Sequence, residues 1–147
     1  MKTTTTKKGL IDAPSRVPDA GAETMRRFVQ RKHRIRAARN RALWEKAAQD
    51  ADRIVEAIAR EFDPKSVYQW GSVLTPESFD EHSDIDIAVE GLGSARRYFE
   101  LLARAESLTG FPLDIVEMEH VEPAYAALIR RHGRRRYPAA PTGKDRA

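Results

Sequence analysis

The chain has 147 residues, of which 33% are charged, with 26 Lys and Arg against 22 Asp and Glu. It contains no cysteine, which excludes disulfide scaffolds, cysteine nucleophiles, iron–sulfur clusters and zinc sites with cysteine ligands. No apolar run approaches the roughly 20 residues that cross a bilayer, and residues 1–8 lack the apolar segment of a secretory signal. We therefore expect a soluble, cytoplasmic protein without a membrane partner, and the length suits a single domain.

The charges are divided into three blocks along the chain. Residues 1–60 carry 15 basic and 7 acidic side chains, a net +8, whereas residues 61–122 carry 4 and 14, a net −10. Residues 123–147 carry 7 and 1, a net +6. Basic flanks permit a nucleic-acid partner. The arginine-rich run from Arg26 to Arg41 lacks the regularly interleaved aromatic residues that would stack bases, so a nucleic-acid partner is not the favoured interpretation.

The N-terminal part is predicted to lie outside the main domain. Residues 1–20 are rich in Thr and Lys, contain Pro14 and Pro18, and are typical of a disordered arm. Residues 21–41 are rich in arginine and carry only a thin apolar stripe, which predicts a basic helical extension or a segment ordered against a partner. The residues of that stripe are Met25, Phe28, Val29 and Ile35.

Residues 42–137 carry the periodic patterns of a folded domain, and residues 138–147 are predicted to be a flexible tail. Apolar residues at helical spacing predict a core-facing helix that ends near Phe62, before Asp63 and Pro64. The remaining predicted elements are strands over 66–70, 84–89 and 111–116, helices over 94–108 and 123–132, and a short edge strand over 134–137. This order predicts an α/β (α+β) domain with a small mixed sheet of three to four strands, flanked by helices.

The most informative pattern is the Asp-Ile-Asp run at the start of the second predicted strand. Side chains alternate along a strand, so Asp84 and Asp86 share one face while Ile85 and Ile87 face the core. The two carboxylates lie roughly 7 Å apart along the strand. Like charges this close favour protonation of one carboxylate unless a cation neutralises them. Hard oxygen ligands favour Mg²⁺ or Mn²⁺.

Two further features strengthen this interpretation. Asp114 is the only acidic residue in an otherwise apolar predicted strand, and it completes a three-carboxylate cluster if the two strands are neighbours. Such a cluster can hold two metal ions for phosphoryl or nucleotidyl transfer, or place one carboxylate as a base. Gly71 and Ser72 follow the first strand, where a glycine lets backbone N–H groups approach a polyphosphate. A turn-capping role for Ser72 is about as well supported by the sequence alone.

Together these segments resemble minimal nucleotidyltransferases of the DNA polymerase beta superfamily. The resemblance rests on residues 68–72 (YQWGS), 83–92 (SDIDIAVEGL) and 111–116 (FPLDIV), and it covers roughly residues 50–137. It is closest to the small MNT-type proteins that commonly pair with a HEPN-domain ribonuclease toxin. The resemblance implies a nucleotidyltransferase fold and the transfer of AMP from ATP to an acceptor, which for MNT antitoxins is a tyrosine of the toxin.

The resemblance also implies roles for individual residues. Asp84 and Asp86 bind Mg²⁺, with as many as two ions in the site. Asp114 is the third ligand or the base, and Gly71 and Ser72 hold the nucleotide triphosphate. The chain departs from the family pattern in having eleven residues rather than ten between Ser72 and Asp84, and in having Val-Leu-Thr where the family usually has Arg and Gly.

Three functions therefore stay open at this point. The favoured one is a Mg²⁺-dependent nucleotidyltransferase that modifies a protein side chain of a partner such as a HEPN toxin. The second is a catalytically degenerate antitoxin that acts by occlusion, which the altered residues after Ser72 would explain. The third is an RNA-modifying nucleotidyltransferase that uses the basic flanks to bind its substrate.

Overall fold

A computed structural model describes residues 20–139 of the chain. The predicted arm and tail therefore lie almost wholly outside the described residues. The elements, in chain order, are α1 (Ala20–Phe62), β1 (Ser66–Trp70), the 3-10 turns η1 (Gly71–Leu74) and η2 (Pro76–Ser78), β2 (Ile85–Glu90), α2 (Ala95–Glu106), β3 (Leu113–Glu117), α3 (Pro123–His132) and β4 (Arg134–Tyr137). None of the helices in this part of the chain is both long enough and apolar enough to span a membrane.

Helix α1 joins the two helices that the sequence predicts on either side of residue 41. The boundary residues are Arg41 and Ala42, both strong helix formers, so no local signal interrupts the hydrogen-bond ladder there. The helix ends at Phe62, because Asp63 adopts a positive φ of 42° and Pro64 follows it. The chain divides into two compact units after Arg36, and all of the strands belong to the second unit.

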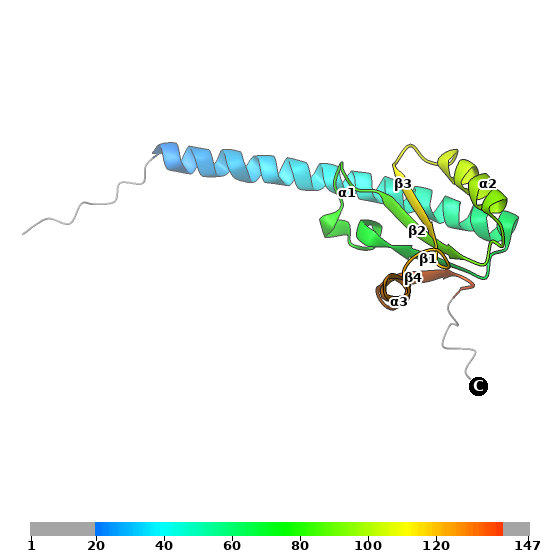
Figure 1. The fold of residues 1–147 in the computed structure, drawn as a ribbon. Helices are drawn as coiled ribbons and strands as arrows, with labels where there is room; N and C mark the ends of the chain where they lie inside the picture. The colour runs from blue at the N-terminus through cyan, green and yellow to red at the C-terminus, as the bar shows by residue number, and fades with distance from the viewer. Residues whose placement is uncertain (1–19, 140–147) are drawn as a thin grey trace, which may run out of the picture. The chain divides into compact units, whose positions relative to one another are not determined.

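The second unit is built on a mixed four-stranded sheet with the order β3-β2-β1-β4 (Figure 1). Strand β1 pairs antiparallel with both β2 and β4. Strands β2 and β3 are parallel and are connected through α2. The structure thus confirms the predicted mixed sheet flanked by helices, and β4 is the predicted edge strand.

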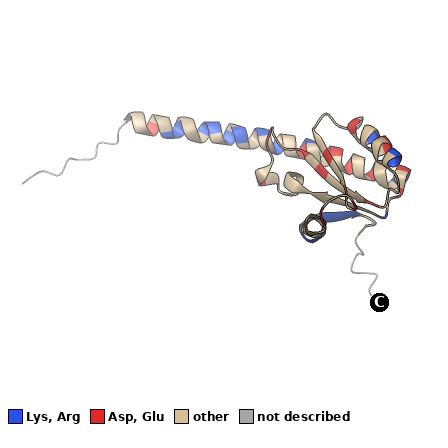
Figure 2. Cartoon of the chain, in the orientation of Figure 1, with Lys and Arg blue, Asp and Glu red and all other residues tan. Residues whose placement is uncertain are grey.

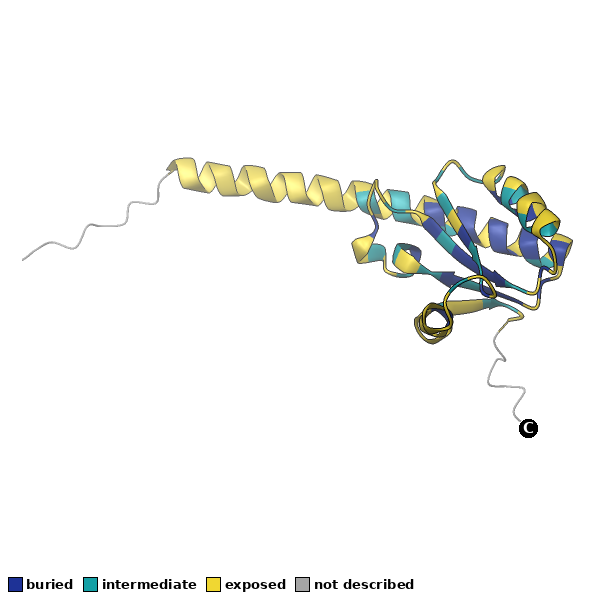
Figure 3. Cartoon of the chain, viewed as in Figure 1, coloured by how far each residue is buried: buried dark blue, intermediate teal, exposed yellow. Residues whose placement is uncertain are grey.

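The two faces of the sheet are covered by different helices. On one face Ile85, Ile87 and Val89 of β2 are fully buried in a cluster that includes Ile54 of α1 and Leu101 of α2. On the other face a smaller cluster joins the sheet to α3; its buried members are Ala88, Met118, Ala126 and Ile129. Figure 3 shows the central strands β1 and β2 and the second half of α1 as largely buried, whereas the edge strand β4 is not. Strand β2 is therefore covered on both faces over its C-terminal half.

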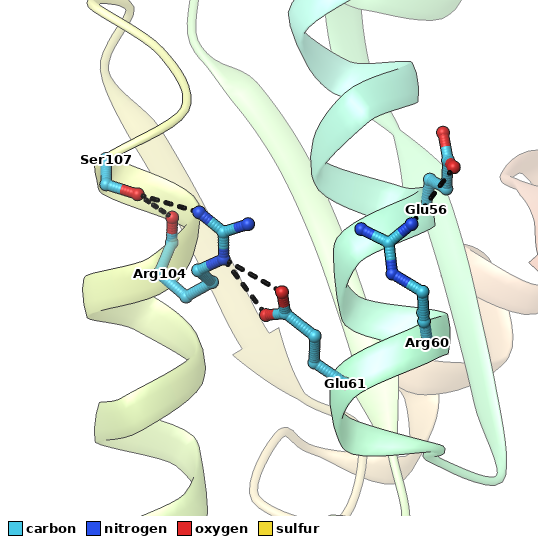
Figure 4. Close-up of polar contacts among 5 residues, drawn as sticks. All are labelled: Glu56, Arg60, Glu61, Arg104 and Ser107. Atoms are coloured by element: carbon cyan, nitrogen blue, oxygen red, sulfur yellow. Dashed lines mark hydrogen bonds and ion pairs between the residues drawn. The ribbon is translucent and has the colours of Figure 1, made fainter.

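A charged contact joins the two helices of the first face (Figure 4). The Arg104 guanidinium of α2 donates from Nε to both carboxylate oxygens of Glu61 on α1, at 3.2 and 3.0 Å. This hydrogen bonding, more than any other effect, lowers the pKa of Glu61. The neighbouring Arg60–Glu56 pair, at 3.5 Å, lies within α1 and links only successive turns. Glu61 is thus the carboxylate that connects the helices.

A buried polar contact ties α1 to the turn before β3. The Asp50 carboxylate is only 2% exposed and accepts a hydrogen bond of 2.7 Å from the Thr109 hydroxyl. The same hydroxyl oxygen accepts from the backbone N–H of Phe111 at 3.1 Å, and the exposed Arg53 guanidinium also contacts Asp50. This chain of bonds fixes the backbone that enters β3, two residues before that strand begins.

We predict that Asp50→Ala destabilises the protein by about 1–3 kcal/mol, because the Thr109 hydroxyl loses its buried acceptor. Urea unfolding would measure the change. Glu56→Ala is a matched control on the same helix, since its exposed ion pair leaves the free energy of unfolding within about 0.5 kcal/mol of the parent. Equal losses in the two variants would contradict this role of Asp50.

Candidate active site

The pairing of three strands sets a row of side chains across the sheet. In register, Trp70 of β1 faces Asp86 of β2, and Asp86 faces Asp114 of β3. Residues in register project from the same side of a sheet, so the two carboxylates are direct neighbours on the face opposite Ile85 and Ile87. The condition that the sequence left open, that the strands of Asp86 and Asp114 be adjacent, is met.

Asp84 lies just before β2, which begins at Ile85 rather than at residue 84 as the alternation predicts. The Ile85 N–H donates to the Pro112 carbonyl at 2.9 Å and so extends the parallel pairing to the start of the strand. Asp84 is exposed and Asp86 is half-buried. The structure therefore places a solvent-facing carboxylate two residues ahead of a partly enclosed one.

Gly71 brings the backbone against the Asp86 carboxylate. Its φ is +78°, and a Cβ added there would lie 2.1 Å from Oδ2 of Asp86 and 3.2 Å from its Cβ. No side chain fits in that space, so glycine is required both by the backbone conformation and by the close approach. The chain turns at this point from β1 into η1 and leaves Gly71 exposed beside the carboxylate row.

Ser72 follows Gly71 and is half-buried. The Thr75 N–H donates to the Ser72 carbonyl at 3.0 Å, and the residue at the N-cap of η1 is Trp70, without a side-chain capping bond. Within residues 20–139 the Ser72 hydroxyl therefore caps no turn. Its turn is held in place by buried Val73, whose carbonyl accepts a hydrogen bond of 2.7 Å from the Trp44 indole.

The electrostatics of the row are unbalanced. The pKa of the Asp86 carboxyl is raised from 3.8 to about 7, first by burial and then by the negative charges of Asp114 and Asp84. No arginine or lysine of the described residues is among the groups that perturb it. The site thus places like charges together without a protein cation to balance them, which is the arrangement that a bound cation would relieve.

Tyr125 of α3 lies beside this row, a position that the sequence does not predict. Its ring meets the Trp70 ring edge to face, with centroids 5.6 Å apart, and 38% of the residue is exposed. Burial raises the pKa of the Tyr125 phenol, and the charges of Asp114 and Asp86 raise it further. No signal in the sequence indicates this proximity, because it depends on how α3 packs on the sheet.

The donor set fits a hard divalent cation in its chemistry. Carboxylate oxygens are the ligands that Mg²⁺ and Mn²⁺ prefer, and Asp86 with Asp114 offers two on neighbouring strands. Within residues 20–139, however, no group of three or more Asp, Glu, His or Cys side chains is already arranged to hold a metal ion. The carboxylates of Asp84, Asp86 and Asp114 would have to converge when a metal binds.

The raised pKa of Asp86 predicts a pH-dependent gain of stability in Asp86→Asn. The folded state holds the Asp86 proton more tightly than the unfolded chain, so its contribution is complete below about pH 4 and is lost as the pH rises through 7. In metal-free buffer at pH 8 we expect Asp86→Asn to be more stable than the parent by about 1–2 kcal/mol, after allowance for solvent screening. The gain should vanish near pH 4.

Urea unfolding at both pH values measures this effect. Glu81→Gln, which alters an exposed carboxylate of the loop before β2, is the control and should show no gain at either pH. A gain for Asp86→Asn that is the same at pH 4 and pH 8 would show that folding does not raise the pKa of the Asp86 carboxyl.

The close approach at Gly71 predicts a second measurable difference. Gly71 and Gly93 both have positive φ, +78° and +87°, but a Cβ at Gly93 would meet nothing within 4 Å. Both alanine variants should lose about 1–2 kcal/mol to backbone strain. Gly71→Ala should lose a further 1–3 kcal/mol, roughly the cost of overpacking, because the added methyl group must displace the Asp86 carboxylate. Similar unfolding free energies for the two variants would rule out the steric contact.

Comparison with known proteins gives the family of the chain. A search of curated proteins finds no match. Residues 52–137 match the family described as Polymerase beta, Nucleotidyltransferase. This segment runs from the second half of α1 to the end of β4, and it contains Gly71, the Asp86–Asp114 pair and the whole sheet. The match covers more than half of the chain, which therefore belongs to the polymerase beta nucleotidyltransferase family.

Proposed function

We propose that the protein transfers AMP from ATP to a hydroxyl group of a partner protein, with Mg²⁺ as the cofactor. The observation that carries the proposal is the register of Asp86 with Asp114, with Gly71 in close contact with Asp86. Family membership supports nucleotidyl transfer as the type of reaction. Bound at the carboxylates, Mg²⁺ would neutralise charge on the triphosphate and on the departing pyrophosphate.

Each candidate site residue would then have a distinct role. Asp84 and Asp86 would hold the cation, and Gly71 would let backbone N–H groups approach the phosphates. The Ser72 hydroxyl would donate one hydrogen bond to the triphosphate. Asp114, on the neighbouring strand, would accept the proton of the acceptor hydroxyl.

The reaction balances without a further reagent. The acceptor oxygen attacks the α-phosphorus and forms a new P–O bond, while the bond between that phosphorus and the bridging oxygen to the β-phosphate breaks. Pyrophosphate leaves with the electron pair of the broken bond, and the hydroxyl proton passes to Asp114. The partner that we propose is a HEPN-domain toxin, with a tyrosine as the acceptor, so that the protein acts as its antitoxin.

A specific observation favours a second candidate function. The described residues contain no group already arranged to hold a metal, and the residues after Ser72 are Val73, Leu74 and Thr75, where the family pattern usually has Arg and Gly. A protein that neutralises the toxin by occlusion, with its nucleotidyltransferase site degenerate, is consistent with both facts. The two candidates differ in whether the carboxylates are needed for neutralisation.

Transfer of label from α-labelled ATP to the partner tests the first proposal. We expect Asp86→Asn to reduce transfer by about 10²–10³-fold or more, since it removes charge that stabilises the reacting groups. The Asp84→Asn/Asp86→Asn double variant should be inactive, and Glu81→Gln, in the same part of the chain, should retain full activity. Intact mass measurement should show the partner gaining one AMP.

Two results would decide against catalysis. Label transfer that persists in the double variant would remove these carboxylates from the mechanism. Full neutralisation of the toxin by the double variant, with no mass gain on the partner, would support occlusion instead. Unfolding curves for each variant would separate loss of chemistry from loss of fold.

A further inference from the structure

The first part of α1, residues 20–36, exposes an unusual amount of apolar side chain. Seven large apolar residues are exposed in the part of the chain that the structure describes, and four of them lie in this segment. Their exposed fractions are 61% for Met25, 56% for Phe28, 42% for Val29 and 52% for Ile35. Figure 3 shows this stretch of the helix exposed throughout. We call residues 20–36 the basic segment.

The exposed apolar residues form one stripe rather than a scatter. At about 100° per residue, Met25, Phe28, Val29 and Ile35 fall within an arc of roughly 120° on the helix. A hollow beside Met25 and Phe28 is lined also by Ala20 and Thr24. A stripe of this width is typical of a helix that packs against another surface, yet these side chains are exposed.

The charge of the segment is strongly positive (Figure 2). It contains six arginines and lysines and a single acidic residue, Glu23. Glu23 already pairs with two of them, Arg26 at 3.7 Å and Arg27 at 3.3 Å. The other four have no carboxylate partner within residues 20–139; they are Arg31, Lys32, Arg34 and Arg36. Within the described residues, therefore, the apolar stripe is uncovered and four of the six basic side chains have no counter-charge.

From these observations we infer that the basic segment is a docking helix for another protein, one that offers an apolar groove rimmed by aspartate and glutamate. The stripe would enter the groove, and the unpaired arginines and lysine would meet the acidic rim. This inference goes beyond nucleotidyl transfer and does not depend on it, because no residue of the segment belongs to the carboxylate site.

The charge and the apolar pattern of the basic segment favour an acidic protein partner over a second copy of the chain, a lipid membrane or RNA. Pairing of this segment with the same segment of a second copy would bring two strongly positive helices together, which repel each other. Lys32 and Arg36 interrupt the apolar stripe, and the Lys32 ammonium lies 5.3 Å from the centre of the Phe28 ring. Inserting that stripe into lipid would bury charge, whereas acidic side chains can pair with it. Phosphate contacts of RNA would use the arginines but leave the apolar stripe uncovered.

Binding of a designed probe by the full chain tests the inference. The probe is a helical peptide with a heptad stripe of leucine flanked by glutamate, and a matched peptide has glutamine in place of leucine. We expect the leucine peptide to bind at least tenfold more tightly than the glutamine peptide, with affinity that falls as salt rises. Phe28→Ser/Ile35→Ser should weaken binding at least tenfold, and Arg31→Glu/Arg34→Glu should do the same.

Phe99→Ser is the matched control, because Phe99 is 64% exposed but lies on α2, outside the basic segment. It should bind the peptide as the parent does, and circular dichroism should show that every variant keeps its helix content. Equal affinity for the two peptides, or unchanged binding by Phe28→Ser/Ile35→Ser, would overturn the inference.

Three competing occupants are tested in the same experiment. Tighter binding to single-stranded polyuridine RNA than to the leucine peptide would overturn the inference in favour of nucleic acid. Tighter binding to phosphatidylserine vesicles would do so in favour of a membrane surface. A stable dimer of the parent that Phe28→Ser/Ile35→Ser dissociates would identify a second copy of the chain. Because none of these readouts uses ATP, failure here is distinguishable from failure of the proposed catalysis.

Discussion

Strand β2 must pack apolar side chains into the core and also present a carboxylate to the candidate site. Because its side chains alternate between the two faces of the sheet, it does both. Ile85, Ile87 and Val89 anchor the sheet to α1 and α2 on one face, so they hold the strand where it is. The residues between them cannot join that core and must face α3. Toward the end of the strand this second face is closed by small Ala88, but at its beginning it presents Asp86. The apolar packing of one face thus offsets the free-energy cost of keeping a carboxylate half-buried on the other.

That cost is typical of a functional site. A carboxyl group whose pKa is raised to about 7 by burial and by two like charges destabilises the folded state at neutral pH, and no basic side chain of residues 20–139 is among the groups that shift it. Other parts of the unit offset the loss. The Asp50–Thr109 hydrogen bond fixes the approach to β3, the Trp44–Val73 bond fixes the turn after Gly71, and the Tyr98 hydroxyl donates to the Ile115 carbonyl at 2.8 Å. The carboxylates are therefore brought together by contacts that are distant from them in sequence.

The difference between local patterns and contacts distant in sequence explains which features the sequence could predict. The alternation around Asp84 and Asp86 and the glycine after β1 are local signals, so the strands and the candidate residues could be identified from them. Helix α1 runs through residue 41 without a break, because the composition changes there while helix propensity does not. The register of Asp86 with Asp114 depends on parallel pairing across α2, and the position of Tyr125 depends on how α3 packs. Neither the strand register nor the position of Tyr125 produces a periodic pattern in the sequence from which it could be predicted.

The contact between Gly71 and Asp86 has a consequence for how related sequences should be interpreted. Any side chain at position 71 would occupy the volume that the carboxylate of position 86 needs, so the two positions are expected to vary together. A relative that has replaced this glycine can accommodate the new side chain only with a smaller or displaced residue on β2, even if its overall fold is intact. A substitution at position 71 would then identify a relative in which the carboxylate of position 86 has been lost or displaced.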